Sequence, residues 1–88
     1  MRVHIVVTGR VQGVGFRYFT AMRARALGLA GAVRNLPNGH VEITASGERA
    51  TLETLIAAVR EGPPGALVRD LRIDWEAAEA PEREFLIR

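Results

Sequence analysis

The chain has 88 residues, with 12 basic and 10 acidic residues, a formal net charge of +2 and no cysteine. This length suits one hydrophobic core, and a content of 48% hydrophobic residues predicts a single folded domain over residues 1–88. The lack of cysteine excludes a disulfide framework and a thiolate metal site. Every basic residue is an arginine, and the arginines alternate with acidic residues instead of forming a basic block, which argues against a nucleic-acid partner.

The first predicted element is a strand at residues 3–7, "VHIVV", because β-branched residues precede a glycine-rich stretch. Its alternate residues are expected to share the buried face: Val3, Ile5 and Val7. The apolar run is only a few residues long and is interrupted by His4, so it fits neither a signal peptide nor a membrane span. We therefore expect a cytoplasmic protein without a membrane partner.

A loop with three glycines leads into a helix predicted over residues 16–27. Apolar side chains recur there at helical spacing, and we expect them to face the core: Phe16, Phe19, Met22 and Ala26. Gly28 then stands where a C-terminal cap belongs.

A turn sequence, "LPNG", lies between residues 30–35, "AGAVRN", and residues 40–46, "HVEITAS". Pro37 fixes its own φ in this turn, and the glycine can adopt a left-handed backbone conformation. These two segments therefore predict a β-hairpin.

A second helix is predicted over residues 50–60, and the Gly-Pro-Pro run at residues 62–64 ends it. Its buried apolar stripe is expected to consist of Leu52, Leu55, Ile56 and Val59. Two alternating segments follow, at residues 71–75, with Trp75 in the core, and at residues 85–87. The order βαββαβ with one further short strand predicts an α+β, ferredoxin-like sandwich, in which an antiparallel sheet carries two helices on one face.

This topology brings two distant segments together. The first strand and the strand at residues 30–35 point the same way, so their C-terminal ends meet at one end of the sheet. The glycine loop after the first strand and Asn35 at the end of the second are therefore expected to be neighbours. We expect the functional site at this edge.

The loop "GRVQGVG" matches neither the G-x-G-x-x-G dinucleotide fingerprint nor the Walker A motif. Its glycines still allow successive backbone N–H groups to turn toward an anion, and the helix start adds positive potential. Arg17, in the first helical turn, adds a planar fork for two phosphate oxygens, so we favour an anion site. The alternative is a purely structural loop, in which Arg17 is solvated and Asn35 caps the hairpin. Gln12 fits loop hydrogen bonding as well as ligand contact.

The other polar residues indicate no second site. His4 and His40 have no third ligand nearby and are interpreted as surface strand residues, so we expect neither a metal nor a cofactor. Three carboxylates of the fourth strand are interpreted as a solvated face: Asp70, Asp74 and Glu76.

Two motifs, "GRVQGVGFRYF" and "VRNLPNGHVEI", resemble those of the acylphosphatase family, and the resemblance continues through "GPPGALV" to the closing "FLIR". It implies hydrolysis of carboxyl-phosphate mixed anhydrides without a metal. By position, the family's phosphate-binding arginine falls on Arg17 and its water-positioning asparagine on Asn35. Its phosphate loop falls on Gln12, Gly13, Val14, Gly15 and Phe16. One departure is Ala32, where many members carry tryptophan or another large residue, and it concerns strand packing.

The residue types agree with this chemistry. The leaving carboxylate is a stable anion at neutral pH and needs no general acid. Phosphoryl transfer depends chiefly on positioning and charge stabilisation, so amides, one arginine and one water-holding group suffice. Asn35 cannot act as a base at ordinary pH, and its amide is expected to orient the water. The loop holds no cysteine, serine or histidine, which favours direct attack by water over a phosphoenzyme.

Two alternatives come from other functional classes. RNA-recognition domains share this fold, and "GVGFRYF" superficially resembles their aromatic RNP1 motif. Phe16 and Phe19, however, fall at a helix start with core spacing and not on a central strand. The other alternative is a noncatalytic sensor that keeps the anion loop. We expect a monomer whose partner is a small acyl phosphate.

Overall fold

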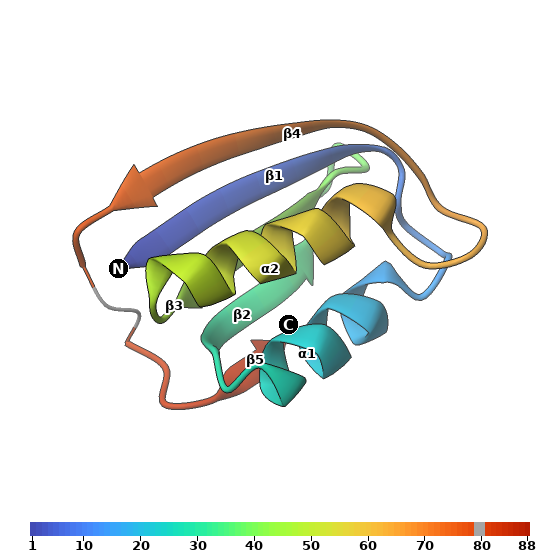
Figure 1. The fold of residues 1–88 in the computed structure, drawn as a ribbon. Coiled ribbons are helices and arrows are strands. Elements are labelled where there is room, and N and C mark those ends of the chain that lie inside the picture. The colour runs from blue at the N-terminus through green and yellow to red at the C-terminus, as the bar shows by residue number, and fades with distance from the viewer. Residues whose placement is uncertain (79–80) are drawn as a thin grey trace.

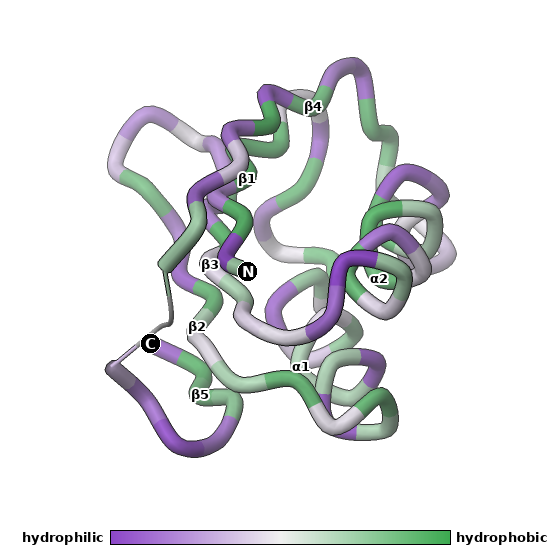
Figure 2. Tube along the Cα trace, turned by 60° about the vertical axis from the view of Figure 1, so that its left-hand side comes forward, coloured by the Kyte–Doolittle hydropathy of each residue, from purple (hydrophilic) through white to green (hydrophobic). Residues whose placement is uncertain are grey.

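The computed structural model describes residues 1–78 and 81–88. Its strands form one sheet in the order β4-β1-β3-β2-β5, and both helices cover the same face of that sheet (Figures 1 and 2). The elements are β1 (Arg2–Arg10), α1 (Phe16–Ala26), β2 (Ala30–Asn35), β3 (Val41–Ser46), α2 (Arg49–Glu61), β4 (Leu67–Glu76) and β5 (Phe85–Ile87). The predicted ferredoxin-like order is confirmed, with β5 added at the sheet edge. No helix in the described residues is both long and apolar enough to span a bilayer.

The register of the strands decides which loops meet. β3 is antiparallel to both β1 and β2, and Val41 at its start pairs with Val7 on one side and Asn35 on the other. The end of β1 and the end of β2 therefore lie at the same end of the sheet. β5 pairs in parallel with β2, which makes the sheet mixed at that edge only.

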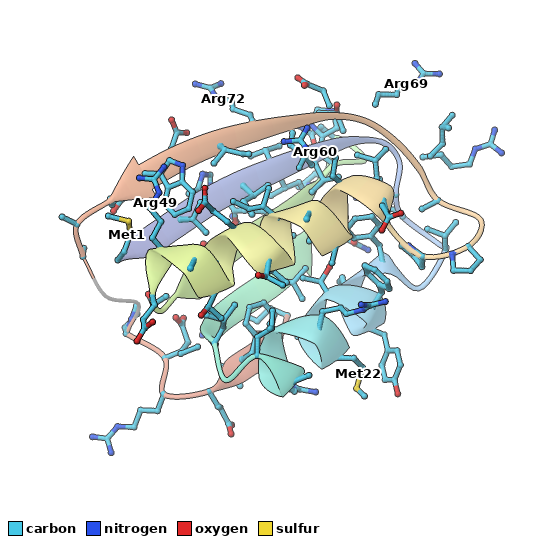
Figure 3. The ribbon with its side chains drawn as sticks, viewed as in Figure 1. Met1, Met22, Arg49, Arg60, Arg69 and Arg72 are labelled. Carbon is cyan, nitrogen blue, oxygen red and sulfur yellow. The ribbon has the colours of Figure 1, made fainter. Side chains whose placement is uncertain are left out.

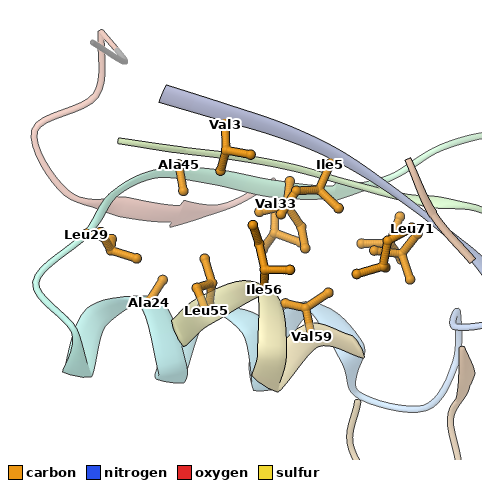
Figure 4. Close-up of a cluster of buried hydrophobic side chains, with 14 of the residues drawn as sticks. Val3, Ile5, Ala24, Leu29, Val33, Ala45, Leu55, Ile56, Val59 and Leu71 are labelled. Carbon is orange, nitrogen blue, oxygen red and sulfur yellow. The ribbon is translucent and has the colours of Figure 1, made fainter. Parts of the chain in front are cut away.

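The core lies between the sheet and the two helices (Figure 4). Alternation along the strands places every second residue of β1 and β3 on this buried face, as expected: Val3, Ile5, Val7, Val41, Ile43 and Ala45. The predicted stripe of α2 is also confirmed as buried: Leu52, Leu55, Ile56 and Val59. Burying such aliphatic side chains is the main favourable term in folding, and this layer holds the strand ends in place.

α1 turns a different face to the sheet from the one predicted. Phe16 is buried as expected, but Met22 is 48% exposed and Ala26 lies at the surface. Phe19 is only partly covered. The buried residues of α1 are Phe16, Thr20, Ala21 and Ala24. Small side chains let the helix approach the sheet closely, and Thr20 is tolerated there because its hydroxyl donates to the Phe16 carbonyl oxygen at 2.9 Å.

The C-terminal strands correct one further expectation. Trp75 lies on the edge strand β4 and is only partly buried, packing against the core from its margin. The guanidinium carbon of Arg49 lies 4.2 Å from the centroid of the Trp75 ring and covers it. In β5, Phe85 is buried whereas Ile87 is 41% exposed. An edge strand has a neighbour on one side only, so its side chains are covered less completely.

Candidate active site

The loop between β1 and α1 is anchored at both ends by buried apolar residues, Val11 and Phe16. Between them, Gly13 and Gly15 have φ of 74° and 76°. This left-handed backbone strains residues that carry a Cβ, which explains the glycines. A Cβ at either position would meet nothing within 4 Å, so backbone conformation and not crowding requires glycine here. The glycines thus turn the chain sharply into the helix.

The backbone N–H groups of this loop are free to bind a ligand. The hydrogen bond that opens α1 runs from the Phe19 N–H to the Gly15 carbonyl oxygen at 3.0 Å. In residues 1–78 and 81–88, no protein group accepts from the N–H groups of residues 13–18, and no side chain caps the helix. The first turn of α1 also carries no acidic residue. Successive unpaired donors at a helix N-terminus attract an anion.

A cavity of about 220 Å³ opens over these donors. Its lining comes from the loop, the first turn of α1, the end of β2 and β5: Val11, Gly13, Gly15, Phe16, Arg17, Tyr18, Asn35 and Ile87. The expected proximity of the glycine loop, Arg17 and Asn35 is confirmed. Among these lining residues Arg17 is the only one with a charged side chain, so the lining offers an anion one cationic side chain and no acidic one.

Arg17 is exposed, and its guanidinium is held by a backbone oxygen. One Nη1–H donates to the main-chain oxygen of Arg88 at 2.8 Å. Arg88 is itself tied to the sheet, because its N–H donates to the Val33 carbonyl oxygen at 2.8 Å. A guanidinium carries five N–H donors, so this contact leaves others for an anion in the cavity.

Asn35 ends β2 at the cavity wall. Its side-chain amide has no hydrogen-bond partner among the described residues, so both its N–H₂ and its oxygen are available. The hairpin turn is capped by a different asparagine, Asn38, whose Oδ1 accepts from the His40 N–H at 3.1 Å. The alternative in which Asn35 caps the hairpin is therefore wrong.

Three of the predicted loop residues have side chains that hold the loop in place. Gln12 donates from Nε2 to the carbonyl oxygens of Leu36, at 2.7 Å, and His40, at 2.8 Å. This side chain ties the loop to the β2–β3 hairpin, and it does not line the cavity. Val14 packs against the core, and the Phe16 ring is buried. These contacts hold the loop in a fixed position relative to Asn35.

A second, larger hollow of about 580 Å³ shares no lining residue with the first. It is lined by Thr8, Gly9, Arg10, Asn38, Gly39, His40 and Arg69. Its arginines are exposed at the surface, and Arg69 projects away from the helices (Figure 3). Nothing in this hollow resembles the row of unpaired amides described above, so the smaller cavity is the better candidate for chemistry.

The remaining polar residues form a surface network. On the open face of the sheet, Glu42 of β3 accepts from Arg34 Nε and, at 2.9 Å, from His4 Nε2. These two contacts, the one to Arg34 above all, lower the pKa of the Glu42 carboxyl. His4 thus has a structural partner, and His40 lies in the hairpin loop. The carboxylates of Asp70, Asp74 and Glu76 are exposed, as expected.

Sequence reasoning missed three residues of the cavity: Val11, which directly precedes the predicted loop residues, Tyr18 and Ile87. Tyr18 falls outside the apolar periodicity of α1. Its position directly after Arg17 in the sequence is the signal that could have predicted its place at the site. Ile87 lies far along the chain, and the parallel pairing of Val33 with Ile87 brings it beside β2. The contact between Arg17 and Arg88 was likewise invisible in the sequence.

Comparison with known proteins gives a consistent result. The acylphosphatase family model matches residues 3–87. A protein named acylphosphatase from Salinibacter ruber is 52% identical over 87 residues, which cover 99% of this chain and 92% of that protein. Another from Trichormus variabilis is 51% identical over 79 residues, covering 90% of this chain and 78% of that one. The crystal structure of acylphosphatase from Bacillus subtilis has a TM-score of 0.96 at 40% identity, with 99% of this chain and 97% of that chain covered.

Proposed function

The chain belongs to the acylphosphatase family, whose members are hydrolases of acid anhydrides, and we propose that it cleaves small acyl phosphates by direct attack of water. The observation that supports this mechanism is the meeting of unpaired loop amides, the Arg17 guanidinium and the free Asn35 amide at one cavity. A phosphate group needs such donors, and a water molecule needs a group that orients it.

In the proposed reaction the amides of the loop and Arg17 bind the phosphate oxygens. They stabilise the charge that these oxygens carry in the transition state. The Asn35 oxygen accepts a hydrogen bond from a water molecule and holds it in line with the scissile bond. The water oxygen forms a new P–O bond while the P–O bond to the acyl group breaks. The carboxylate leaves with that electron pair, and the protons of the water pass to phosphate oxygens and solvent.

No other group is required by this scheme. The carboxylate is a weak base, so it departs without protonation. The chain has no cysteine, and the loop offers no side-chain nucleophile, which is why water and not a phosphoenzyme carries the reaction. In residues 1–78 and 81–88, no three metal-ligating side chains gather in one place. Independence from a metal is part of the proposal.

The test is phosphate release from acetyl phosphate, with p-nitrophenyl phosphate as a phosphomonoester control and with EDTA in a parallel series. We expect acetyl phosphate to be hydrolysed, the monoester to be a poor substrate, and EDTA to have no effect. Inorganic phosphate should inhibit competitively, because product and substrate use the same amides. Activity that EDTA abolishes and a divalent cation restores would contradict the proposal.

A further inference from the structure

One wall of the cavity is apolar and unusually exposed. In the described part of the chain, five large hydrophobic side chains are exposed: Met1, Tyr18, Met22, Leu67 and Ile87. Two of these, Tyr18 at 63% exposure and Ile87 at 41%, line the cavity that holds the loop amides. Exposed apolar side chains that gather at a binding cavity usually contact a ligand.

The two side chains come from elements that the structure holds firmly. Tyr18 lies in the first turn of α1, directly after Arg17, and Ile87 ends β5. The hydrogen bond from Arg17 to the main-chain oxygen of Arg88 ties these two elements together at the cavity. The pairing of Ile87 with Val33 fixes β5 against β2. The backbone positions of the apolar wall are therefore set before any ligand arrives, which lowers the entropic cost of binding.

We propose that Tyr18 and Ile87 bind the acyl group of the substrate and make this enzyme prefer acyl phosphates with an apolar, above all aromatic, acyl group. This inference rests on the proposed function. The acyl carbon is joined to the phosphate through one oxygen, so a phosphate on the loop amides leaves the acyl group only a few bonds away, beside the residues that flank Arg17. The Tyr18 ring offers a face on which a planar acyl group stacks, and Ile87 offers aliphatic surface.

The charge distribution favours this class over anionic acyl groups. Arg17 is the only residue with a charged side chain among the described lining of the cavity. In the proposed reaction the phosphate group pairs with Arg17. The arginine-lined hollow of Arg10 and Arg69 shares no residue with this cavity. A second negative group on the acyl chain would therefore meet Tyr18 and Ile87 and lose hydration without gaining a partner.

The experiment compares kcat/KM for acetyl, butyryl, succinyl and benzoyl phosphate in the full chain and in four variants. For the unsubstituted chain we expect kcat/KM to rise from acetyl to benzoyl by roughly tenfold, mostly through KM, because an acyl group on a half-open apolar wall loses part of its hydration. Tyr18→Ala should reduce this ratio to within about threefold of unity. Tyr18→Phe should keep the ratio, since the ring and not the hydroxyl carries the contact.

Met22→Ala is the matched control. Met22 is an exposed apolar residue of the same helix, one turn after Tyr18, that points into solvent and does not line the cavity (Figure 3). Its substitution should leave the benzoyl-to-acetyl ratio unchanged. Ile87→Ala provides a second test from β5, with a thermal melt to confirm that the strand remains folded. As a readout without turnover, benzoylphosphonate should inhibit more strongly than acetylphosphonate, and Tyr18→Ala should abolish that difference.

The outcomes separate the two proposals. If both acyl phosphates are hydrolysed but Tyr18→Ala leaves their ratio at the unsubstituted value, the role of the apolar wall is wrong while the proposed function stands. A preference for succinyl over benzoyl phosphate would also overturn the apolar specificity and direct attention to Arg10 and Arg69. If no acyl phosphate is hydrolysed, the proposed function fails and this inference fails with it.

Discussion

Arg17 stands at the point where the loop amides end and the apolar wall begins. A cation in the first turn of a helix is electrostatically unfavourable, because the N-terminal end of the helix already carries partial positive charge. In the proposed function a bound phosphate would reverse this effect, because its negative charge would interact with both the guanidinium and the unpaired N–H groups of the cavity. The proposed phosphate ligand would thus account for a position of Arg17 that does not favour the helix itself.

Replacing Arg17 with lysine tests the geometry of this contact at constant charge. An ammonium is a point charge and cannot donate two parallel hydrogen bonds, so we expect kcat/KM for acetyl phosphate to fall on the order of 10²-fold and phosphate inhibition to weaken. Arg23→Lys, an exposed arginine on the same helix outside the cavity, is the control and should retain activity. Near-normal kinetics for Arg17→Lys would place Arg17 outside the mechanism.

Asn35 separates substrate binding from chemistry. If its amide only holds the attacking water, Asn35→Ala should lower kcat by roughly 10²-fold while the inhibition constant of phosphate stays nearly unchanged. Asn38→Ala is the matched control, because Asn38 caps the hairpin turn and lies outside the cavity. That variant should lose about 1 kcal/mol of unfolding free energy and keep its activity per folded molecule. Full turnover by folded Asn35→Ala would leave the water without a positioning group.

At the scale of elements, the site depends on how β1, β2 and β3 are held together. Their backbone pairing sets the register, and the Gln12 side chain bridges the loop to the hairpin. On the opposite face, the Glu42 carboxylate of β3 contacts Arg34 of β2 and His4 of β1. This cluster joins the same three strands and shares no residue with the lining of the cavity, so we expect it to affect stability and not chemistry.

The lowered pKa of Glu42 gives this cluster a defined pH dependence. A carboxyl whose folded pKa lies below its unfolded value stabilises the fold above the ordinary glutamate pKa of about 4.3, and loses that contribution as pH falls through the folded pKa. We expect Glu42→Gln to cost roughly 0.5–1 kcal/mol of unfolding free energy at neutral pH, because Arg34 is largely solvated and the pair is screened.

Urea unfolding of Glu42→Gln and the unsubstituted chain at neutral and acidic pH measures this effect. The difference between the two should shrink toward zero below the lowered pKa of Glu42, where the unsubstituted chain also carries a neutral carboxyl. Glu53→Gln, at an exposed carboxylate of α2, is the control and should show little difference at either pH. A difference for Glu42→Gln that stays constant with pH would mean that packing, and not charge, is responsible.

At the scale of the whole molecule, the uncovered face of the sheet bears on the RNA-binding alternative. RNA-recognition domains of this fold stack bases on aromatic side chains of the two central strands. Here the central strands are β1 and β3, and their outward positions hold no phenylalanine, tyrosine or tryptophan. Those positions hold Arg2, His4, Val6, Thr8, Glu42, Thr44 and Ser46, and His4 is already bonded to Glu42. Much of the charge on this face is paired, as in the contacts of Glu42 with Arg34 and His4.

We therefore expect single-stranded RNA to bind no better than a weak, salt-sensitive background. With a net charge of only +2 and dispersed arginines, any association should disappear as salt increases. Fluorescence anisotropy with labelled oligonucleotides at two salt concentrations measures it, and a polyarginine peptide serves as the positive control. Binding that resists salt and depends on base sequence would revive the RNA-binding alternative.

The sequence by itself determined the order of elements, the alternation of β1 and β3, the stripe of α2 and the meeting of the loop with Asn35. These features follow from local periodicity, from glycine and proline positions, and from the few topologies that short connections allow. The resemblance of its motifs to one family predicted the family, which the comparisons confirm, and suggested the proposed activity.

Other features were decided only by tertiary packing. The face of α1 was mispredicted because Met22 suits a core by hydrophobicity, whereas Ala21 and Ala24 suit it by allowing the helix to approach the sheet. The role of Gln12 depends on two backbone carbonyls of a hairpin more than twenty residues away. Ile87 reaches the cavity through a parallel pairing that local sequence does not encode. Propensity describes a residue and its near neighbours along the chain, but the walls of this site are contacts between segments that meet only in the folded state.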